Sequence, residues 1–179
     1  MAKARCTGRP TGKDRSLLPQ TPATIRSNTI NASRREAAEM TVPKEVESTD
    51  WSVTDLVGWR DRKAPLLGYL VFDGESGPVT LMVRAAQSSM SAGRSAMCLL
   101  CGTVRKANQI SLFTARRTGS AGRNGNTVGT YMCADLTCAA QVRHHPLNRG
   151  KELADDEIAA RSAQMLERVR AFAADVQRT

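Results

Sequence analysis

The sequence predicts an α+β fold in which a small antiparallel sheet, a cysteine knuckle and flanking helices form one domain. Three patterns point to it: short apolar runs separated by turn residues, two cysteine pairs around a Gly-rich segment, and an amphipathic C-terminal stretch. With 179 residues, the chain is long enough for one domain with a real core, or for one domain and a tail. We therefore expect a single domain over residues 21–179, preceded by a tail.

Residues 1–20 are predicted to be a disordered basic tail. They carry several Lys and Arg side chains, are punctuated by Gly and Pro, and have little apolar content besides Leu17 and Leu18. The tail is either an idle extension or an electrostatic arm for an anionic partner, and its composition fits both interpretations.

Two short helices are predicted within residues 21–45. Thr21 offers a capping hydroxyl, and Pro22 suits the first helical position. Ser33 and Glu36 have the spacing of a capping box, in which each side chain bonds to the backbone N–H of the other residue. Both helix starts are therefore specified locally, by residues that lie close together in the chain.

Residues 46–95 are predicted to contain a β-hairpin. Its strands are residues 68–72 and 79–83, joined by a turn that contains Asp and Gly. Trp51 and Trp59 lie in the acidic stretch before the hairpin. We expect both to anchor the core, because large aromatic side chains are scarce in this chain.

Residues 96–149 contain the cysteine pairs and are predicted to add two further strands to the sheet. Residues 109–117 and 128–132 have the apolar content of strands, and a Gly-rich loop over residues 118–126 separates them. A short helix is expected over residues 139–143, directly after the last cysteine of this segment.

Residues 150–179 are predicted to form a C-terminal amphipathic helix that runs from Asp155 to Val176. Three acidic residues at its start suit the positive end of the helix dipole. Its apolar side chains recur near helical spacing: Ile158, Met165, Leu166, Val169, Phe172 and Val176.

The formal net charge is +9, and most of the surplus lies on the cysteine-bearing segment. Residues 84–149 carry nine Lys and Arg side chains and one acid, Asp135. This surplus favours an anionic partner, either nucleic acid or an acidic protein face. No run of about eighteen apolar residues occurs, and no apolar segment follows the basic N-terminus. We therefore expect a cytoplasmic protein without membrane contact.

Paired cysteines in a reducing cytoplasm are metal ligands or redox thiols more often than disulfides. Cys98-x-x-Cys101 places two sulfurs on a tight turn, and Cys133-x4-Cys138 can place a second pair where a strand leads into a helix. Four thiolates complete the tetrahedral shell of one Zn²⁺ and leave no open position for water. The pattern predicts one structural zinc ion that takes no part in catalysis.

Other interpretations of these residues stay open at this point. Cys98 and Cys101 could be the redox pair of a thiol oxidoreductase, or the thiols could be buried without a ligand. His144 or His145 could replace one ligand, with Cys138 as the first candidate for replacement. No nucleophile elbow, P-loop or dinucleotide fingerprint occurs, so we expect no catalytic residue and no small-molecule substrate.

The Gly-rich loop is cationic, with Arg116, Arg117 and Arg123 flanking three glycines. Arginine side chains suit carboxylate and phosphate, and glycines let backbone N–H groups approach a partner closely. The loop therefore binds RNA phosphates or an acidic protein surface, or it is a solvated loop whose charge serves solubility. Phe113 and Tyr131 are the only aromatics near it, which disfavours recognition by base stacking.

Several segments together resemble the elongation factor G-binding proteins, the zinc-finger family that includes the fusidic-acid resistance proteins. The similarity covers roughly residues 24–175 and is most specific from Arg116 to Cys138. It rests on DLVGWRD at 55–61, GYLV at 68–71, MCLLC at 97–101, TARR at 114–117, AGRNGN at 121–126 and GTYMCADLTC at 129–138.

The resemblance implies a fold and a ligand arrangement. The zinc domain would be a treble clef over residues 96–149. Cys98 and Cys101 would lie on the knuckle, and Cys133 and Cys138 would lie near the final short helix. The resemblance therefore agrees with the zinc site that the cysteine spacing predicts.

The resemblance also implies a function. The protein would bind elongation factor G and help to release it from the ribosome, with fusidic-acid tolerance as a consequence. Leu99, Arg123 and Asn124 would contact the factor, with Arg116 and Arg117 beside them. The alternative is a zinc protein that binds the ribosome or ribosomal RNA without elongation factor G, with an affinity that falls steeply with salt.

Overall fold

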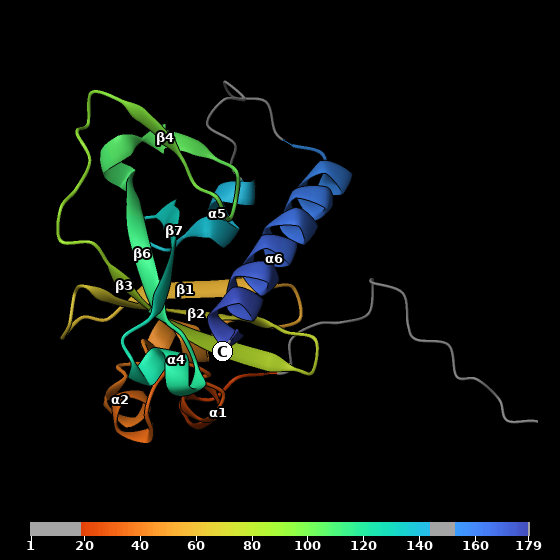
Figure 1. Ribbon diagram of the computed structural model, residues 1–179. Helices are drawn as coiled ribbons and strands as arrows, with labels where there is room; N and C mark the ends of the chain where they lie inside the picture. Colours follow the sequence, from red (N-terminus) through yellow and green to blue (C-terminus); the bar gives the residue numbers. More distant parts are fainter. Residues whose placement is uncertain (1–18, 144–152, 179) are drawn as a thin grey trace, which may run out of the picture.

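A computed structural model of the chain describes residues 19–143 and 153–178 (Figure 1). Nearly all of the predicted tail, and both histidines at 144–145, lie outside the described residues. The elements in chain order are α1 (Pro22–Ser27), α2 (Arg34–Glu39), α3 (Lys44–Glu47), β1 (Leu56–Arg60), β2 (Leu67–Asp73), β3 (Pro78–Ala85), β4 (Ser95–Met97), β5 (Val104–Lys106), η1 (Ala107–Gln109), β6 (Ile110–Arg116), α4 (Gly119–Arg123), β7 (Thr127–Cys133), α5 (Cys138–Arg143) and α6 (Asp155–Gln177).

The main sheet is antiparallel, with the strand order β1-β2-β3-β6-β7, and β4 and β5 form a separate two-stranded ribbon. Neighbouring strands follow one another along the chain, except that β4 and β5 are inserted between β3 and β6. The insertion carries the first cysteine pair, so the fold brings this pair beside the end of the last strand. The α+β class with a small antiparallel sheet and a C-terminal helix is confirmed.

Alternation along β2 creates two hydrophobic clusters, one on each face of the sheet. Leu70 and Phe72 belong to the larger cluster, which includes α6 and the four cysteines, whereas Tyr69 and Val71 belong to the smaller one. The smaller cluster contains the N-terminal helices and both tryptophans. Trp51 and Trp59 are 3% and 7% exposed, so their predicted role as core anchors is confirmed.

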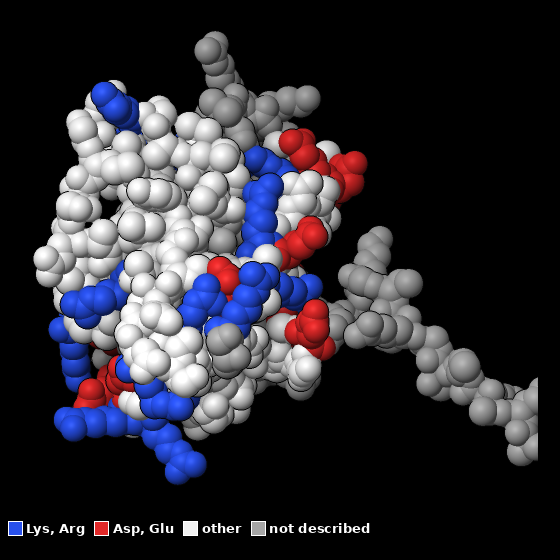
Figure 2. All heavy atoms as spheres, viewed as in Figure 1, with Lys and Arg blue, Asp and Glu red and all other residues white. Residues whose placement is uncertain are grey.

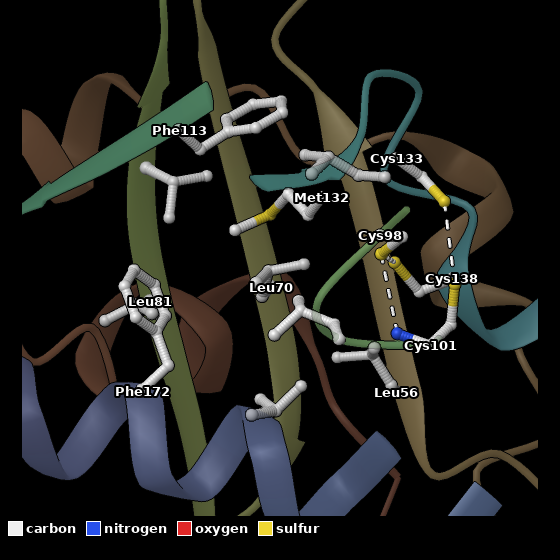
Figure 3. Packing of buried hydrophobic residues seen from close by; sticks show 14 of the residues in the cluster. Leu56, Leu70, Leu81, Cys98, Cys101, Phe113, Met132, Cys133, Cys138 and Phe172 are labelled. Atoms are coloured by element: carbon white, nitrogen blue, oxygen red, sulfur yellow. Dashed lines mark hydrogen bonds between the residues drawn. The ribbon is translucent and has the colours of Figure 1, made fainter. Parts of the chain in front are cut away.

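Helix α6 covers the face of the larger cluster (Figure 1). Phe172 points toward Leu81 of the sheet (Figure 3). Arg170 ties the helix to the end of β2, because its Nε donates to the carbonyl oxygen of Asp73 at 2.7 Å and its Nη2 to the carboxylate at 3.2 Å. Among the described residues, no helix combines the length and the apolar character needed to cross a membrane.

Both predicted helix starts are confirmed, each with a complete capping box. The hydroxyl of Thr21 accepts from the N–H of Thr24, and Thr24 returns the bond. Ser33 and Glu36 make the same pair of bonds at the start of α2. These signals were readable because all the partners lie within four residues of one another.

Several features depart from the sequence prediction, including the short helix α3, which was not predicted. β1 forms in the acidic stretch, which was not predicted to be a strand, because its residues pair with β2 from Leu56 to Arg60. The ribbon of β4 and β5 was also not foreseen. The segment predicted as a Gly-rich loop, residues 118–126, contains the short helix α4, whose first residue Gly119 has a φ of 64°.

Lys and Arg side chains are not spread evenly over the surface. Figure 2 shows them gathered over α2 and along α6, whereas the surface over β4 and β6 is mostly uncharged. On this face the positive charge is therefore concentrated away from β4 and β6 (Figure 2).

The side chain of Asn31 forms hydrogen bonds to β3 and β6 where these two strands diverge. These strands pair at Arg84 and Ala85 and then diverge. The side chain of Asn31, which is 5% exposed, accepts from the N–H of Met82 at 2.9 Å. Its amide donates to the carbonyl oxygens of Met82 at 2.8 Å and Arg116 at 3.3 Å. One side chain thus takes the place of the missing ladder bonds.

We expect Asn31→Ala to lower the free energy of unfolding by about 2–4 kcal/mol, because it leaves buried backbone groups without partners. Urea denaturation measures the change. Asn108→Ala is the matched control: Asn108 is exposed, and its loss should change stability by less than about 0.5 kcal/mol. Equal effects of the two substitutions would show that the Asn31 bonds contribute nothing specific.

Candidate metal centre

Four cysteines from three parts of the chain converge at one end of the larger cluster (Figure 3). Cys98 and Cys101 flank the turn after β4, Cys133 ends β7, and Cys138 begins α5. All four are buried, with at most 5% exposure. Their sulfurs lie within 4.8 Å of one another, so the structure brings together every ligand that the spacing predicted.

The sulfur geometry fits zinc. The Sγ atoms of Cys98 and Cys138 are 3.6 Å apart, and those of Cys101 and Cys133 are 3.7 Å apart. A tetrahedron with Zn–S bonds of about 2.3 Å has edges of roughly 3.8 Å, whereas a disulfide needs about 2.05 Å. The four cysteines hold one zinc ion, and four protein ligands leave no open coordination position.

The thiols also need a cation because they cannot all ionise in a buried site without one. The pKa of Cys101 is lowered, first by a hydrogen bond from Cys133 and then by one from Cys138. The pKa of Cys133 is raised, chiefly by its bond to Cys101. Zinc replaces the shared protons and stabilises four thiolates at once.

The turn between the first two ligands, called the knuckle below, is Cys98 to Cys101. The N–H of Cys101 points at the Cys98 sulfur, 3.4 Å away, and the turn closes with the N–H of Gly102 on the Cys98 carbonyl oxygen at 2.9 Å. Gly102 has a φ of 70°, which favours glycine. Leu100 points inward and is 2% exposed, whereas Leu99 points outward and is 47% exposed.

The four-residue spacer of the second pair has a structural reason. Leu136 lies in it, with a φ of 60° and 1% exposure. It packs against two strand glycines: a Cβ on Gly58 would lie 2.5 Å from its carbonyl oxygen, and one on Gly68 would lie 2.4 Å from its Cδ1. The longer spacer therefore carries a leucine that anchors the ligand turn to β1 and β2.

A second contact fixes the same turn from the other side. Arg105 of β5 binds Asp135 with both terminal nitrogens, at 3.1 to 3.2 Å. Asp135 Oδ1 also accepts from the hydroxyl of Thr137 at 2.8 Å. Burial acts to raise the pKa of Asp135, but the bonds from Arg105 and Thr137 lower it overall. The pKa of Arg105 is raised, first by Asp135, and the Cys133 sulfur contributes to the increase.

The partner-binding residues predicted from the sequence fall into two groups. Arg116 and Arg117 form intramolecular ion pairs: Arg116, whose side chain is 40% exposed, pairs with Glu36 of α2 at 2.6 Å, and Arg117 pairs with Asp175 of α6 at 3.1 Å. The other three residues point to solvent. Leu99 lies on the knuckle, and Arg123 and Asn124 lie at the end of α4, toward the opposite end of β7.

Three residues join Leu99 in an exposed apolar surface that was not predicted. Met97, Val104 and Tyr131 are 50%, 36% and 43% exposed. We call these three residues with Leu99 the knuckle patch. Tyr131 could have been recognised from its alternation with the buried Met132, but the pairing of Met97 with Val104 depends on the unforeseen ribbon.

One ligand pair on a knuckle, with the other at a strand end and in the first turn of a helix, defines a treble-clef zinc-finger protein. A family model described as the FBP C-terminal treble-clef zinc-finger matches residues 24–176, and the chain belongs to this family. The search of curated proteins and the search of solved structures returned no match. The predicted family, fold class and zinc ion are confirmed.

Removal of zinc is expected to destabilise the whole domain, because the ion joins three separate parts of the chain. Structural zinc contributes on the order of 10–16 kcal/mol in finger peptides. In a chain of this size each kcal/mol shifts the unfolding midpoint by roughly 2–4 °C, so we expect a decrease of more than about 10 °C. Calorimetry before and after chelation, with zinc added back, measures it. An unchanged midpoint in verified metal-free protein would contradict the prediction.

Alanine at either strand glycine is expected to cost about 1–3 kcal/mol of stability, because the new Cβ overlaps Leu136. The two sites differ in whether truncation of Leu136 relieves the overlap. Gly68→Ala meets the side chain, so Leu136→Ala should remove most of its cost; Gly58→Ala meets the carbonyl oxygen, so its cost should persist. Double-mutant cycles by urea denaturation measure both couplings. Equal couplings would refute this assignment.

Proposed function

We propose that this protein is a non-enzymatic zinc-finger protein that binds elongation factor G and promotes its release from the ribosome. The knuckle patch is the observation that carries the proposal. Among the described residues, five large hydrophobic side chains are exposed, and four of them form this patch; the fifth is Val53. Clustered apolar exposure of this kind is typical of protein–protein contact sites.

The patch is continuous because its backbones are in contact. Met97 and Val104 are direct partners in the ribbon, so their side chains share one face. The N–H of Leu99 donates to the carbonyl oxygen of Tyr131 at 2.8 Å, which fixes the knuckle beside β7. A rigid apolar surface held by the metal centre suits docking without rearrangement.

The exposed part of α4 extends the proposed surface. β7 is an edge strand of seven residues, roughly 23 Å long, between α4 and the metal centre. Thr127 and Gly129 along it are exposed, so the surface continues from the patch to Arg123 and Asn124. In this proposal the apolar patch supplies affinity and Arg123 meets an acidic group of the factor. Arg116 and Arg117 hold the end of β6 in place instead of contacting the factor.

A protein partner fits these features better than RNA does. Three arginines of the basic segment already form ion pairs with acids of the same chain: Arg105, Arg116 and Arg117. Phosphate binding depends on cations that are available to displace counterions, and an apolar patch offers nothing to a phosphate backbone. Direct binding to ribosomal RNA is therefore the second candidate. A role in fusidic-acid tolerance depends on release of the factor and is proposed with it.

A redox enzyme fits less well. The candidate pair, Cys98 and Cys101, provides two of the four zinc ligands, so its thiolates are engaged with the metal. The proposal of a binding protein without catalytic residues rests on this use of the thiols and on the character of the family.

The test compares two exposed apolar residues. Leu99→Ser should weaken binding of purified elongation factor G by roughly tenfold or more, as expected for a central contact. Val53→Ser is the matched control, since Val53 is 63% exposed and lies outside the patch; it should bind as the unaltered chain does. Calorimetric titration gives both affinities, and zinc content must be equal in all samples.

Arg123→Ala extends the test to the electrostatic contact. It should weaken binding by several-fold at low salt and by less at high salt, since exposed ion pairs are screened. Absence of any binding to the factor, together with salt-dependent binding to ribosomal RNA, would favour the second candidate. Equal affinities of the Leu99→Ser and Val53→Ser variants would remove the patch from the proposal.

A further inference from the structure

The metal centre carries more negative charge than its ion neutralises. Four thiolates around Zn²⁺ leave two negative charges in excess. The four cysteines are at most 5% exposed, so water solvates this charge poorly. A buried charge without a partner is costly, and a cation in the surrounding protein is expected to accompany it.

Arg105 is a cation that the fold places at the ligand turn. It lies on β5, and its side chain is 13% exposed. Two other arginines reach the ligand segments, but they bind backbone carbonyl oxygens: Arg60 binds that of Ala134 and Arg168 that of Leu100, each at 3.3 Å.

Asp135, between the third and fourth ligands, binds Nη1 of Arg105 at 3.1 and 3.2 Å and its Nη2 at 3.1 Å. The carboxylate of Asp135 therefore fixes the plane and the position of the guanidinium. Asp135 is itself only two residues from Cys133 in the chain.

The guanidinium has donor capacity beyond its bonds to Asp135. Arginine carries five N–H groups, and the carboxylate occupies only part of them. Asp135, which holds the guanidinium, is two residues from Cys133 in the chain, and the Cys133 sulfur contributes to the raised pKa of Arg105. A thiolate is a stronger acceptor than a thiol, because hydrogen bonds to charged groups are the stronger ones. Zinc-bound Cys133 therefore suits this donor better than the free thiol does.

We infer that Arg105 donates a hydrogen bond to the zinc-bound thiolate of Cys133 and thereby protects the metal centre from electrophiles. The bond withdraws electron density from the sulfur, which makes it a weaker nucleophile. Asp135 is the positioning residue that aims the donor. This role is independent of the proposed partner, because it concerns retention of the metal and would hold whatever the knuckle patch binds.

Iodoacetamide tests the inference on the zinc-loaded full chain. The thiolate sulfur attacks the carbon that bears iodine, a thioether forms and iodide leaves. The thioether is no longer an anionic ligand, so zinc is released and can be followed with a colorimetric chelator. We expect Arg105→Gln to speed zinc release by roughly tenfold, within the range for outer-shell partners of metal ligands. Lys106→Gln removes a neighbouring exposed charge from the same strand and should leave the rate unchanged.

A spectroscopic measurement distinguishes hydrogen-bond donation by Arg105 to the sulfur from a purely structural role of Arg105 in the turn. With cobalt in place of zinc, loss of a hydrogen bond to sulfur moves the sulfur-to-metal charge-transfer band to lower energy. Arg105→Gln should show this shift, and Asp135→Asn, which breaks the ion pair but keeps the arginine, should shift the band less. Arg105→Lys keeps a cationic donor and should lie between the unaltered chain and Arg105→Gln in both readouts.

Two outcomes would overturn the inference. An unshifted charge-transfer band in Arg105→Gln, with zinc released as fast as from Asp135→Asn, would mean that the pair only braces the turn. Unchanged rates in Arg105→Gln, with a full complement of zinc, would mean that no protection exists. If Arg105→Gln does not fold, Arg105→Lys decides: a rate and a band equal to those of the unaltered chain would also overturn it.

Discussion

Four buried sulfurs within 4.8 Å of one another join a separate ribbon, the end of the edge strand and the first turn of a helix. The first pair lies on a ribbon, β4 and β5, that is separate from the main sheet. The second pair joins the end of the edge strand β7 to the first turn of α5. Because the ion holds both pairs, it also sets where the knuckle lies. Leu100 then points into the core, while Leu99 remains on the surface.

Local signals in the sequence were sufficient for the starts of α1, α2 and α6 and for the ligand set, whereas tertiary contacts were not visible in it. Ser33 caps α2 through a partner three residues away, and the cysteines are recognisable by spacing alone. The pairing of β1 with β2, by contrast, overrides an acidic composition. Asn31 looks like an ordinary loop residue, and its role depends on strands more than fifty residues away. The spacing of the second cysteine pair does not reveal the role of Leu136, because its glycine partners lie in other elements.

Charge counting along the chain overstated how cationic the surface of the cysteine-bearing segment is. The segment from residue 84 to residue 149 has nine basic side chains and one acid. The acids that pair with Arg116 and Arg117 come from α2 and α6, outside that segment. Local net charge therefore missed pairs that only the fold creates. What remains at the proposed docking surface is chiefly apolar, with Arg123 and Asn124 at its margin.

Leu136 packs against Gly58 and Gly68, and this contact links metal affinity to the hairpin of β1 and β2, which contains no metal ligand. The turn between Cys133 and Cys138 packs on β1 and β2, so it reaches its ligating shape only when those strands are paired. By thermodynamic reciprocity, the free energy by which pairing of β1 with β2 favours zinc binding equals the free energy by which bound zinc favours that pairing. The dissociation constant of zinc therefore also reports whether β1 and β2 are paired.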